Sequence, residues 1–188
     1  MSMHKLCFVV AALGIFACPF TASAQAQMHY GFGTPVSKAE LSKYFDSRAD
    51  GAGLPAGSGT AATGAKVFAE NCAACHGDHL QGNPAKGIGG DKLLGGRGTL
   101  ASKSPVKTVE SYWPYATTLF DYVKRAMPFS SPGSLSNDQV YSVVAYILSQ
   151  AKIIKANEKM DASSLAKVKM PNRNGFIPDP RPELELYR

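Results

Sequence analysis

Apolar residues recur at the spacing of an α-helix in three stretches of the sequence, residues 63–72, 117–129 and 134–150. The first stretch reads TGAKVFAENC, and Thr63 is a residue type that favours the N-cap position. In the second, the apolar stripe ends at Met127, because Pro128 restricts the backbone of the residue before it. In the third, Ser136 and Gln139 have the spacing of a capping box. The pattern predicts a mainly α domain whose helices pack around one core.

The segments on both sides of this domain lack such a pattern. Residues 25–60 begin with a short helical pattern and continue into the turn-rich connector DGAGLPAGSGTAATG. Residues 152–188 are rich in Lys, Asn and Pro, with few apolar residues at regular spacing. We therefore expect a core domain over residues 61–151. An irregular N-terminal extension precedes it, and an irregular C-terminal extension wraps around it.

Residues 1–24 have the order of a secretory signal peptide. Lys5 precedes an apolar run from Leu6 to Phe20, and the small residues of TASAQAQ follow the run. Cleavage is expected after Ala24 or Ala26. The run is shorter than the roughly 20 residues of a membrane-spanning helix, and no later segment approaches that length. The sequence therefore predicts an exported, periplasmic protein without a membrane span.

Few cysteines are left once this segment is removed. Cys7 and Cys18 belong to the signal peptide. Of the four cysteines in the sequence, Cys72 and Cys75 remain. With Lys5 removed, 19 basic and 14 acidic residues give a net charge of +5. The basic residues form no run dense enough to suggest nucleic-acid binding.

The stretch ENCAACHGDHL contains a Cys-x-x-Cys-His motif made by Cys72, Cys75 and His76. A redox disulfide, a zinc site and a covalently attached haem all use such clusters. No β-rich run flanks the motif as in a thioredoxin-type site. With His79, the zinc ligands would crowd into 8 residues, whereas zinc domains usually join two separated ligand pairs. The spacing instead predicts one covalently bound haem c, because Phe68 and the two thiols share a helical face and His76 follows beneath the iron.

The sixth iron ligand distinguishes an electron carrier from a haem enzyme or gas-binding protein with an open or labile sixth position. His79 is held on the same side of the ring as His76. Met127 sits at a helix-to-loop junction 51 residues after His76, enough chain to reach the other face. Met170 lies beyond the last predicted core helix and would require a long return. We expect His76 and Met127 as axial ligands of an electron-transfer protein that is not an enzyme, with the open-site protein as the alternative.

Residues 61–151 resemble a class I cytochrome c. The resemblance rests on a helix leading into CAACHG, a glycine-rich loop, a helix ending in MP, and a closing helix containing VAYIL. It implies the class I fold, in which the first and last helices cross with Phe68 and Tyr146 at the matching positions. The family usually has a loop proline whose carbonyl accepts the Nδ1 proton of the axial histidine. This sequence has GIGGDKLLGG there, so the partner of His76 is left unassigned.

A narrower resemblance covers nearly the whole exported chain. The stretches RADGAGLPAGSGTAATG, ESYWPYATTLFDYVKRAMPF and KVKMPNRNGFIPDPRPE are similar to the cytochrome subunits and acceptor cytochromes of periplasmic sulfite dehydrogenases. They also resemble the haem subunit of the sulfur dehydrogenase of bacterial thiosulfate oxidation. The resemblance implies a molybdenum-containing partner that oxidises sulfite or a related sulfur species, and a downstream cytochrome or oxidase. This chain, with one haem motif and no thiol left for molybdenum, is expected to relay electrons only.

The stretch from residue 79 to residue 109 is basic, with Asp91 as its acidic residue. Its basic residues are Lys86, Lys92, Arg97, Lys103 and Lys107. Two interpretations stay open: a basic rim beside the haem that steers an acidic partner, or an ordinary solvated surface. Arg97 is alternatively a contact of a haem propionate, as are Trp113 and Tyr115 in the stretch YWPY.

Overall fold

The computed structural model describes residues 33–41, 47–83 and 89–182. The predicted signal peptide, residues 1–24, lies outside the described residues, as does Lys86 of the basic stretch. The chain divides into two units, Met1–Pro35 and Val36–Arg188, and every helix and strand below belongs to the second. Within the described ranges, no helix has both the length and the apolar character needed to cross a bilayer.

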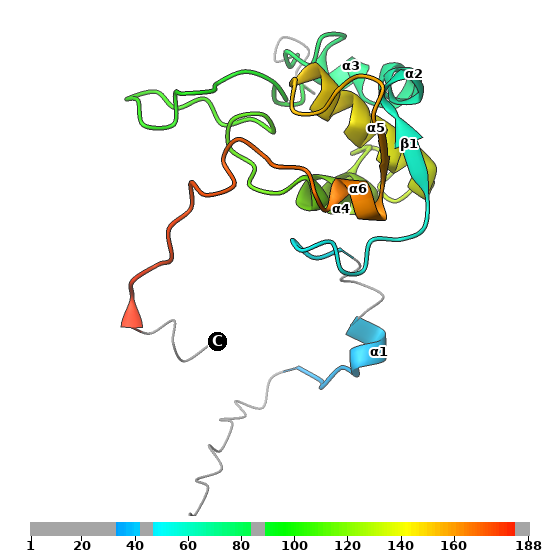
Figure 1. The fold of residues 1–188 in the computed structure, drawn as a ribbon. Coiled ribbons are helices and arrows are strands. Elements are labelled where there is room, and N and C mark those ends of the chain that lie inside the picture. The colour runs from blue at the N-terminus through cyan, green and yellow to red at the C-terminus, as the bar shows by residue number, and fades with distance from the viewer. Residues whose placement is uncertain (1–32, 42–46, 84–88, 183–188) are drawn as a thin grey trace, which may run out of the picture. The chain divides into compact units, whose positions relative to one another are not determined.

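The second unit is mainly α-helical, as the sequence predicts. Its elements in chain order are α1 (Lys38–Leu41), β1 (Ser58–Thr60), α2 (Ala61–Asn71), α3 (Ala73–His76), α4 (Ala116–Ala126), α5 (Asn137–Gln150), β2 (Lys159–Asp161) and α6 (Ala162–Leu165) (Figure 1). The two strands pair antiparallel, with Gly59 opposite Met160. The helices α2, α4 and α5 correspond to the three stretches with helical spacing.

The start of α2 corrects one expectation. Thr60, and not Thr63, is the N-cap, and its hydroxyl oxygen accepts a hydrogen bond from the Thr63 backbone nitrogen at 3.3 Å. The helix begins earlier because β1 ends at Thr60 with extended backbone, the conformation that an N-cap requires. At its other end α2 ends at Asn71 with Cys72 as its C-cap, and the short helix α3 carries the chain to His76.

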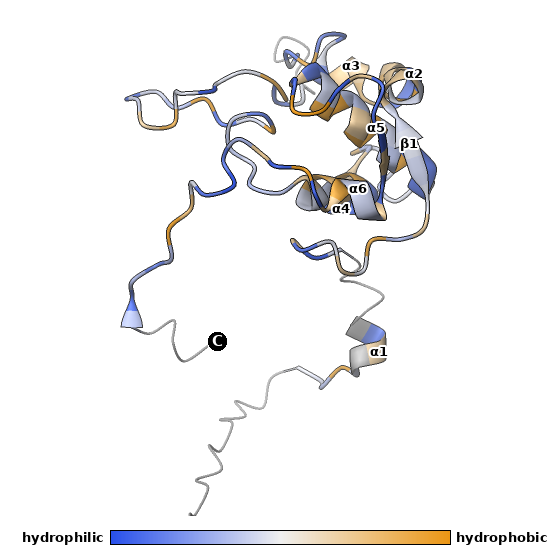
Figure 2. Ribbon diagram, viewed as in Figure 1, coloured by the Kyte–Doolittle hydropathy of each residue, from blue (hydrophilic) through white to orange (hydrophobic). Residues whose placement is uncertain are grey.

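Helices α2 and α5 pack closely together. A Cβ at Gly64 would lie 1.8 Å from the Ser142 carbonyl oxygen, so only a glycine lets the two backbones approach this far. Further along the contact, the rings of Phe68 and Tyr146 lie 5.3 Å apart between centroids. This pair confirms the contact between the first and last helices of the core. Figure 2 shows hydrophobic residues on both helices.

The ends of α4 and α5 are as predicted. Helix α4 ends at Ala126, and Met127 follows with extended backbone before Pro128. Ser136 and Gln139 form the reciprocal capping box of α5: the Gln139 nitrogen donates to Ser136 Oγ at 3.2 Å, and the Ser136 nitrogen donates to Gln139 Oε1 at 2.9 Å. These caps fix where each helix meets the loops that carry the site.

The C-terminal extension is more regular than predicted. It contains β2, which pairs with β1, and α6, whose N-cap Asp161 accepts hydrogen bonds from the nitrogens of Ser163 and Ser164. Met160, Leu165 and Met170 are buried in the core. Each element is only three or four residues long, too short to produce a periodic signal in the sequence.

Candidate haem site

A cavity of about 870 Å³ opens between α2, α3, α4 and α5 and the loops that join them. This volume is within the ~300–1,000 Å³ range of small-molecule and cofactor pockets. Cys72, Cys75, His76, Met127 and Trp113 line it, so the structure brings five of the seven predicted site residues to one cavity. Much of the remaining lining comes from the loops over residues 89–93, 107–109 and 128–130, and α4 and α5 add Leu119, Tyr122, Val123, Val143 and Ile147.

Cys72 and Cys75 present free thiols to this cavity, and both are partly buried. Burial, and then the neighbouring Cys75, raise the pKa of Cys72 to about 11. The Cys72 thiol is therefore protonated at neutral pH, unlike the low-pKa thiols of redox motifs. Across the described part of the chain, no three His, Cys, Asp or Glu side chains are grouped to hold a metal ion. Thioether attachment is the chemistry that suits these two sulfurs.

The His76 ring has a defined orientation. Its Nδ1 lies 2.7 Å from the Asp91 carbonyl oxygen. A carbonyl oxygen only accepts hydrogen bonds, so Nδ1 carries the proton and the Nε2 lone pair is left for a metal. This contact supplies the partner of His76 that the sequence leaves unassigned.

The loop that carries Asp91 lies directly against the imidazole. A Cβ at Gly90 would lie 2.6 Å from Cε1 and 2.7 Å from Nδ1 of His76, so a side chain there would strike the ring. Two backbone hydrogen bonds hold the loop to α3: the Gly90 nitrogen donates to the Cys75 carbonyl at 3.0 Å, and the Gly82 nitrogen donates to the His76 carbonyl at 2.7 Å. The glycine therefore does what a loop proline does in the family pattern, by placing a backbone carbonyl at Nδ1.

The Met127 thioether lines the cavity from the end of α4, and its residue is partly buried. Leu119 and Val123 line the cavity from the same helix. Met170, the other methionine weighed as an iron ligand, is 3% exposed in the core and is not among the cavity-lining residues. The position of Met127 thus fits the predicted role, and ligation of an iron by it stays a prediction.

The three predicted propionate contacts differ in their surroundings. Trp113 lines the cavity, and its ring packs edge-on against Tyr122 at 5.6 Å. Arg97 lies outside the lining: its Nε pairs with Glu110 Oε1 at 2.6 Å, and its Nη2 donates to the Ala151 carbonyl. Tyr115 also lies outside the lining. The structure therefore brings one of the three to the cavity.

Sequence reasoning missed three contributors to the site: Gly90, the Asp91 carbonyl and Tyr122. The paired glycines of GIGGD were the available signal for a close backbone approach. Of the basic stretch, Lys92 and Lys107 line the cavity, and Lys103 does not. Phe129, directly after Pro128, also lines the cavity and is 85% exposed.

Known proteins resemble the chain in both sequence and fold. The family model described as cytochrome c matches residues 61–151. Cytochrome c6 of Synechococcus elongatus is 34% identical over 94 residues, which are 48% of this chain and 90% of that protein. Thiosulfate dehydrogenase of Stutzerimonas stutzeri (strain A1501) is 31% identical over 98 residues, 52% of this chain and 30% of that protein. For other curated relatives, the matched part of this chain covers from 12% to 97% of the relative's length.

The similarity to a solved structure extends further along the chain. The sulfane dehydrogenase SoxCD from Paracoccus pantotrophus contains a chain that superposes with a TM-score of 0.68 and 39% sequence identity. The match covers 84% of this chain and 76% of that chain. It therefore includes residues beyond 61–151, the part that the family model matches.

Proposed function

The chain belongs to the cytochrome c family of electron carriers, and on that premise we propose that it is a periplasmic cytochrome serving a sulfur-oxidising molybdoenzyme. It carries one haem c, accepts electrons one at a time from the dehydrogenase, and passes them to a downstream cytochrome or oxidase. Residues 1–24 are removed on export, and the chain itself does not oxidise the sulfur substrate.

The cavity residues fit this cofactor. The Cys72 and Cys75 sulfurs would attach the porphyrin, and His76 Nε2 and the Met127 sulfur would be the axial ligands. A haem with histidine and methionine ligands supplies a one-electron couple whose reduction potential the methionine raises. The chain's own part is to hold the imidazole by its Nδ1 proton at the Asp91 carbonyl, which fixes the ring plane and makes Nε2 more basic.

The observation that carries the choice of partner is the similarity to the sulfane dehydrogenase structure. A generic haem domain would account for residues 61–151 alone. The similarity instead covers 84% of the chain at 39% identity, so it includes extension residues that the haem motif does not require. This extent supports a shared type of partner, a dehydrogenase acting on sulfite or a related sulfur species.

Stopped-flow spectroscopy tests the proposal. The oxidised cytochrome is mixed without oxygen with a purified sulfite dehydrogenase and excess sulfite, and the absorption of the reduced haem is followed. We expect reduction within the turnover time of the dehydrogenase. Mixtures lacking either the enzyme or sulfite are the controls. Reduction no faster than in these controls would leave the chain an electron carrier with a different donor.

A further inference from the structure

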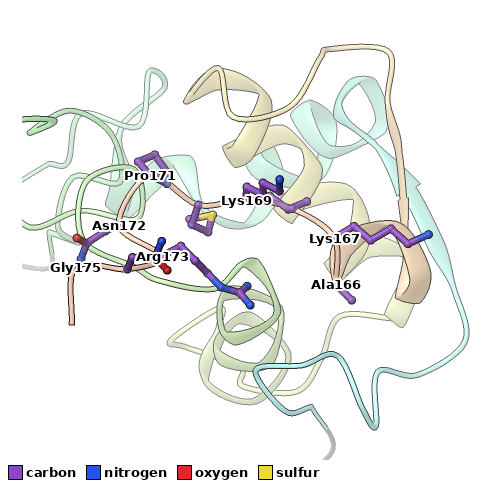
Figure 3. A pocket seen from close by; sticks show the side chains of 10 residues that line it. Ala166, Lys167, Lys169, Pro171, Asn172, Arg173 and Gly175 are labelled. Carbon is purple, nitrogen blue, oxygen red and sulfur yellow. The ribbon is translucent and has the colours of Figure 1, made fainter. Parts of the chain in front are cut away.

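Residues 170–176, here called the strap, lie outside the part of the chain that the cytochrome c model matches. The strap begins at Met170, which is 3% exposed, and its later residues are largely exposed. Residues 166–175 surround a hollow of about 580 Å³, and Figure 3 shows the side chains of Asn172 and Arg173 in its wall. The hollow itself holds no cluster that points to a ligand, so the significance of the strap lies in what it contacts.

Three contacts join the strap to residues 112–115. The Asn172 Nδ2 donates a hydrogen bond to the Tyr112 carbonyl oxygen at 2.7 Å. The Arg173 guanidinium carbon lies 4.6 Å from the centre of the Tyr115 ring, within the range of a cation–π contact. The Phe176 ring packs edge-on against the Tyr112 ring at 5.2 Å. The contacts fall on both sides of Trp113 in the sequence.

The segment held in this way forms part of the cavity wall. Trp113 lines the cavity, and its indole packs on Tyr122, which also lines it. Lys107, another lining residue, places Nζ 5.2 Å from the centre of the Tyr112 ring. The strap thus contacts Tyr112 and Tyr115, while Trp113, which lies between them in the sequence, lines the cavity. Displacing Tyr112 or Tyr115 would move Trp113.

The local structure of the strap directs its side chains to these contacts. The Arg173 nitrogen donates to the Met170 carbonyl at 3.1 Å, and the Gly175 nitrogen donates to the Asn172 carbonyl at 3.1 Å. A Cβ at Gly175 would lie 1.8 Å from Asn172 Oδ1, so the absence of a side chain leaves room for the amide that reaches Tyr112. The turn, the glycine and the amide act as one unit.

We propose that Asn172 and Arg173 are positioning residues of the haem site, which hold Trp113 in the cavity wall from outside the part of the chain that the cytochrome c model matches. The proposal deepens the proposed function and rests on it, because Trp113 matters for electron transfer only if the cavity holds the haem. A strap of this kind makes the C-terminal extension part of the redox site.

Trp113 is the chain's one tryptophan, so its fluorescence reports on this position alone. A bound haem quenches the emission of a nearby indole by energy transfer. The test compares the full-length haem protein with Asn172→Ala and Arg173→Ala, and with the control variants Lys169→Ala and Asn174→Ala. Both control positions are exposed and flank the contact residues. For each protein we record the Trp113 emission and its quenching by acrylamide. The reduction potential, the haem content and the far-ultraviolet circular dichroism are measured on the same samples.

We expect both test variants to keep their helix and haem content while Trp113 becomes brighter and more accessible to acrylamide. The population with a displaced indole should rise about fivefold, the factor that corresponds to about 1 kcal/mol for one lost hydrogen bond. The potential should shift in the same variants. Arg173→Lys keeps a cation above Tyr115 and should restore part of the wild-type signal.

Emission and accessibility equal to wild type in both test variants, or an equal change in the two controls, would overturn the proposal. If a test variant loses helix content, Asn172→Gln and Arg173→Lys replace it as milder changes with the same expected direction. Failure of the sulfite dehydrogenase to reduce the protein bears on the donor only, because the indole signal is read from the cytochrome alone.

Discussion

Replacing Gly90 by alanine places a methyl group where the His76 ring now lies. The added Cβ would be 2.6 Å from Cε1, well inside contact distance, so the loop or the ring must move. Forcing a methyl group into a packed site typically costs about 1–3 kcal/mol. Losing the 2.7 Å hydrogen bond from Nδ1 to the Asp91 carbonyl adds about 1 kcal/mol. We therefore expect Gly90→Ala to destabilise the protein by about 2–4 kcal/mol.

The same substitution should alter the redox site. The Nδ1 hydrogen bond makes the imidazole more basic, and a more basic ligand favours the oxidised, more positively charged iron. Its loss should raise the reduction potential. Where the hydrogen bond favours the oxidised state by about 1 kcal/mol, its loss raises the reduction potential by about 40 mV, since 59 mV corresponds to a tenfold change in a one-electron equilibrium. The midpoint temperature of thermal unfolding should fall by roughly 4–16 °C, because each kcal/mol of lost stability lowers it by about 2–4 °C in a chain of this size.

Asp91→Ala is the matched control, because it removes the carboxylate and keeps the carbonyl that His76 uses. Unfolding is followed by circular dichroism and the potential by a spectroscopic redox titration, on wild type and both variants. The reasoning predicts that Asp91→Ala behaves like wild type. It would be refuted by a Gly90→Ala protein with wild-type stability and potential, or by an Asp91→Ala protein that shows the same losses.

Three further changes have defined outcomes. Met127→Ala should abolish the weak methionine–iron charge-transfer band of the oxidised protein and allow rapid carbon monoxide binding after reduction. Lys92→Glu with Lys107→Glu should slow reduction by an acidic partner and weaken its dependence on ionic strength, as stopped-flow rates will show. Burial, and then Asp161, raise the pKa of Tyr141 to about 12 from 10.0, so folding stability should fall as pH rises through this interval. Tyr141→Phe should flatten that fall in denaturant titrations at high pH.

The helices of the core were predictable because their information is local. The spacing of apolar residues in α4 and α5, the capping box at Ser136 and the stop at Pro128 each lie within a few residues of what they determine. The Cys-x-x-Cys-His motif is equally local, and so its three side chains were placed on one cavity wall. Met127 could be chosen because chain length and the helix end restrict the positions that reach the cavity.

The walls of the site were not predictable, because single contacts between distant residues form them. The Asp91 carbonyl is 15 residues from His76, and any backbone carbonyl in the loop was equally suitable by sequence. The charge of Arg97 suggested either a basic rim or a propionate contact, whereas the partners that the structure gives it, Glu110 and the Ala151 carbonyl, depend on how the loop folds back. Charge alone identifies a side chain that needs a partner and cannot identify the partner.

Features outside the Cys-x-x-Cys-His motif are where this cytochrome is expected to differ from others that carry the same motif. The locally encoded helices supply Cys72, Cys75, His76 and Met127, the residues expected to attach the haem and bind its iron. The hydrogen bond at His76 and the strap contacts at Tyr112 act on the ligand and on the cavity wall, and neither changes the motif. Reduction potential depends on hydrogen bonding and solvent exposure around the iron. Properties that suit the protein to a particular donor are therefore expected in the loop and the C-terminal extension, where the sequence alone is least informative.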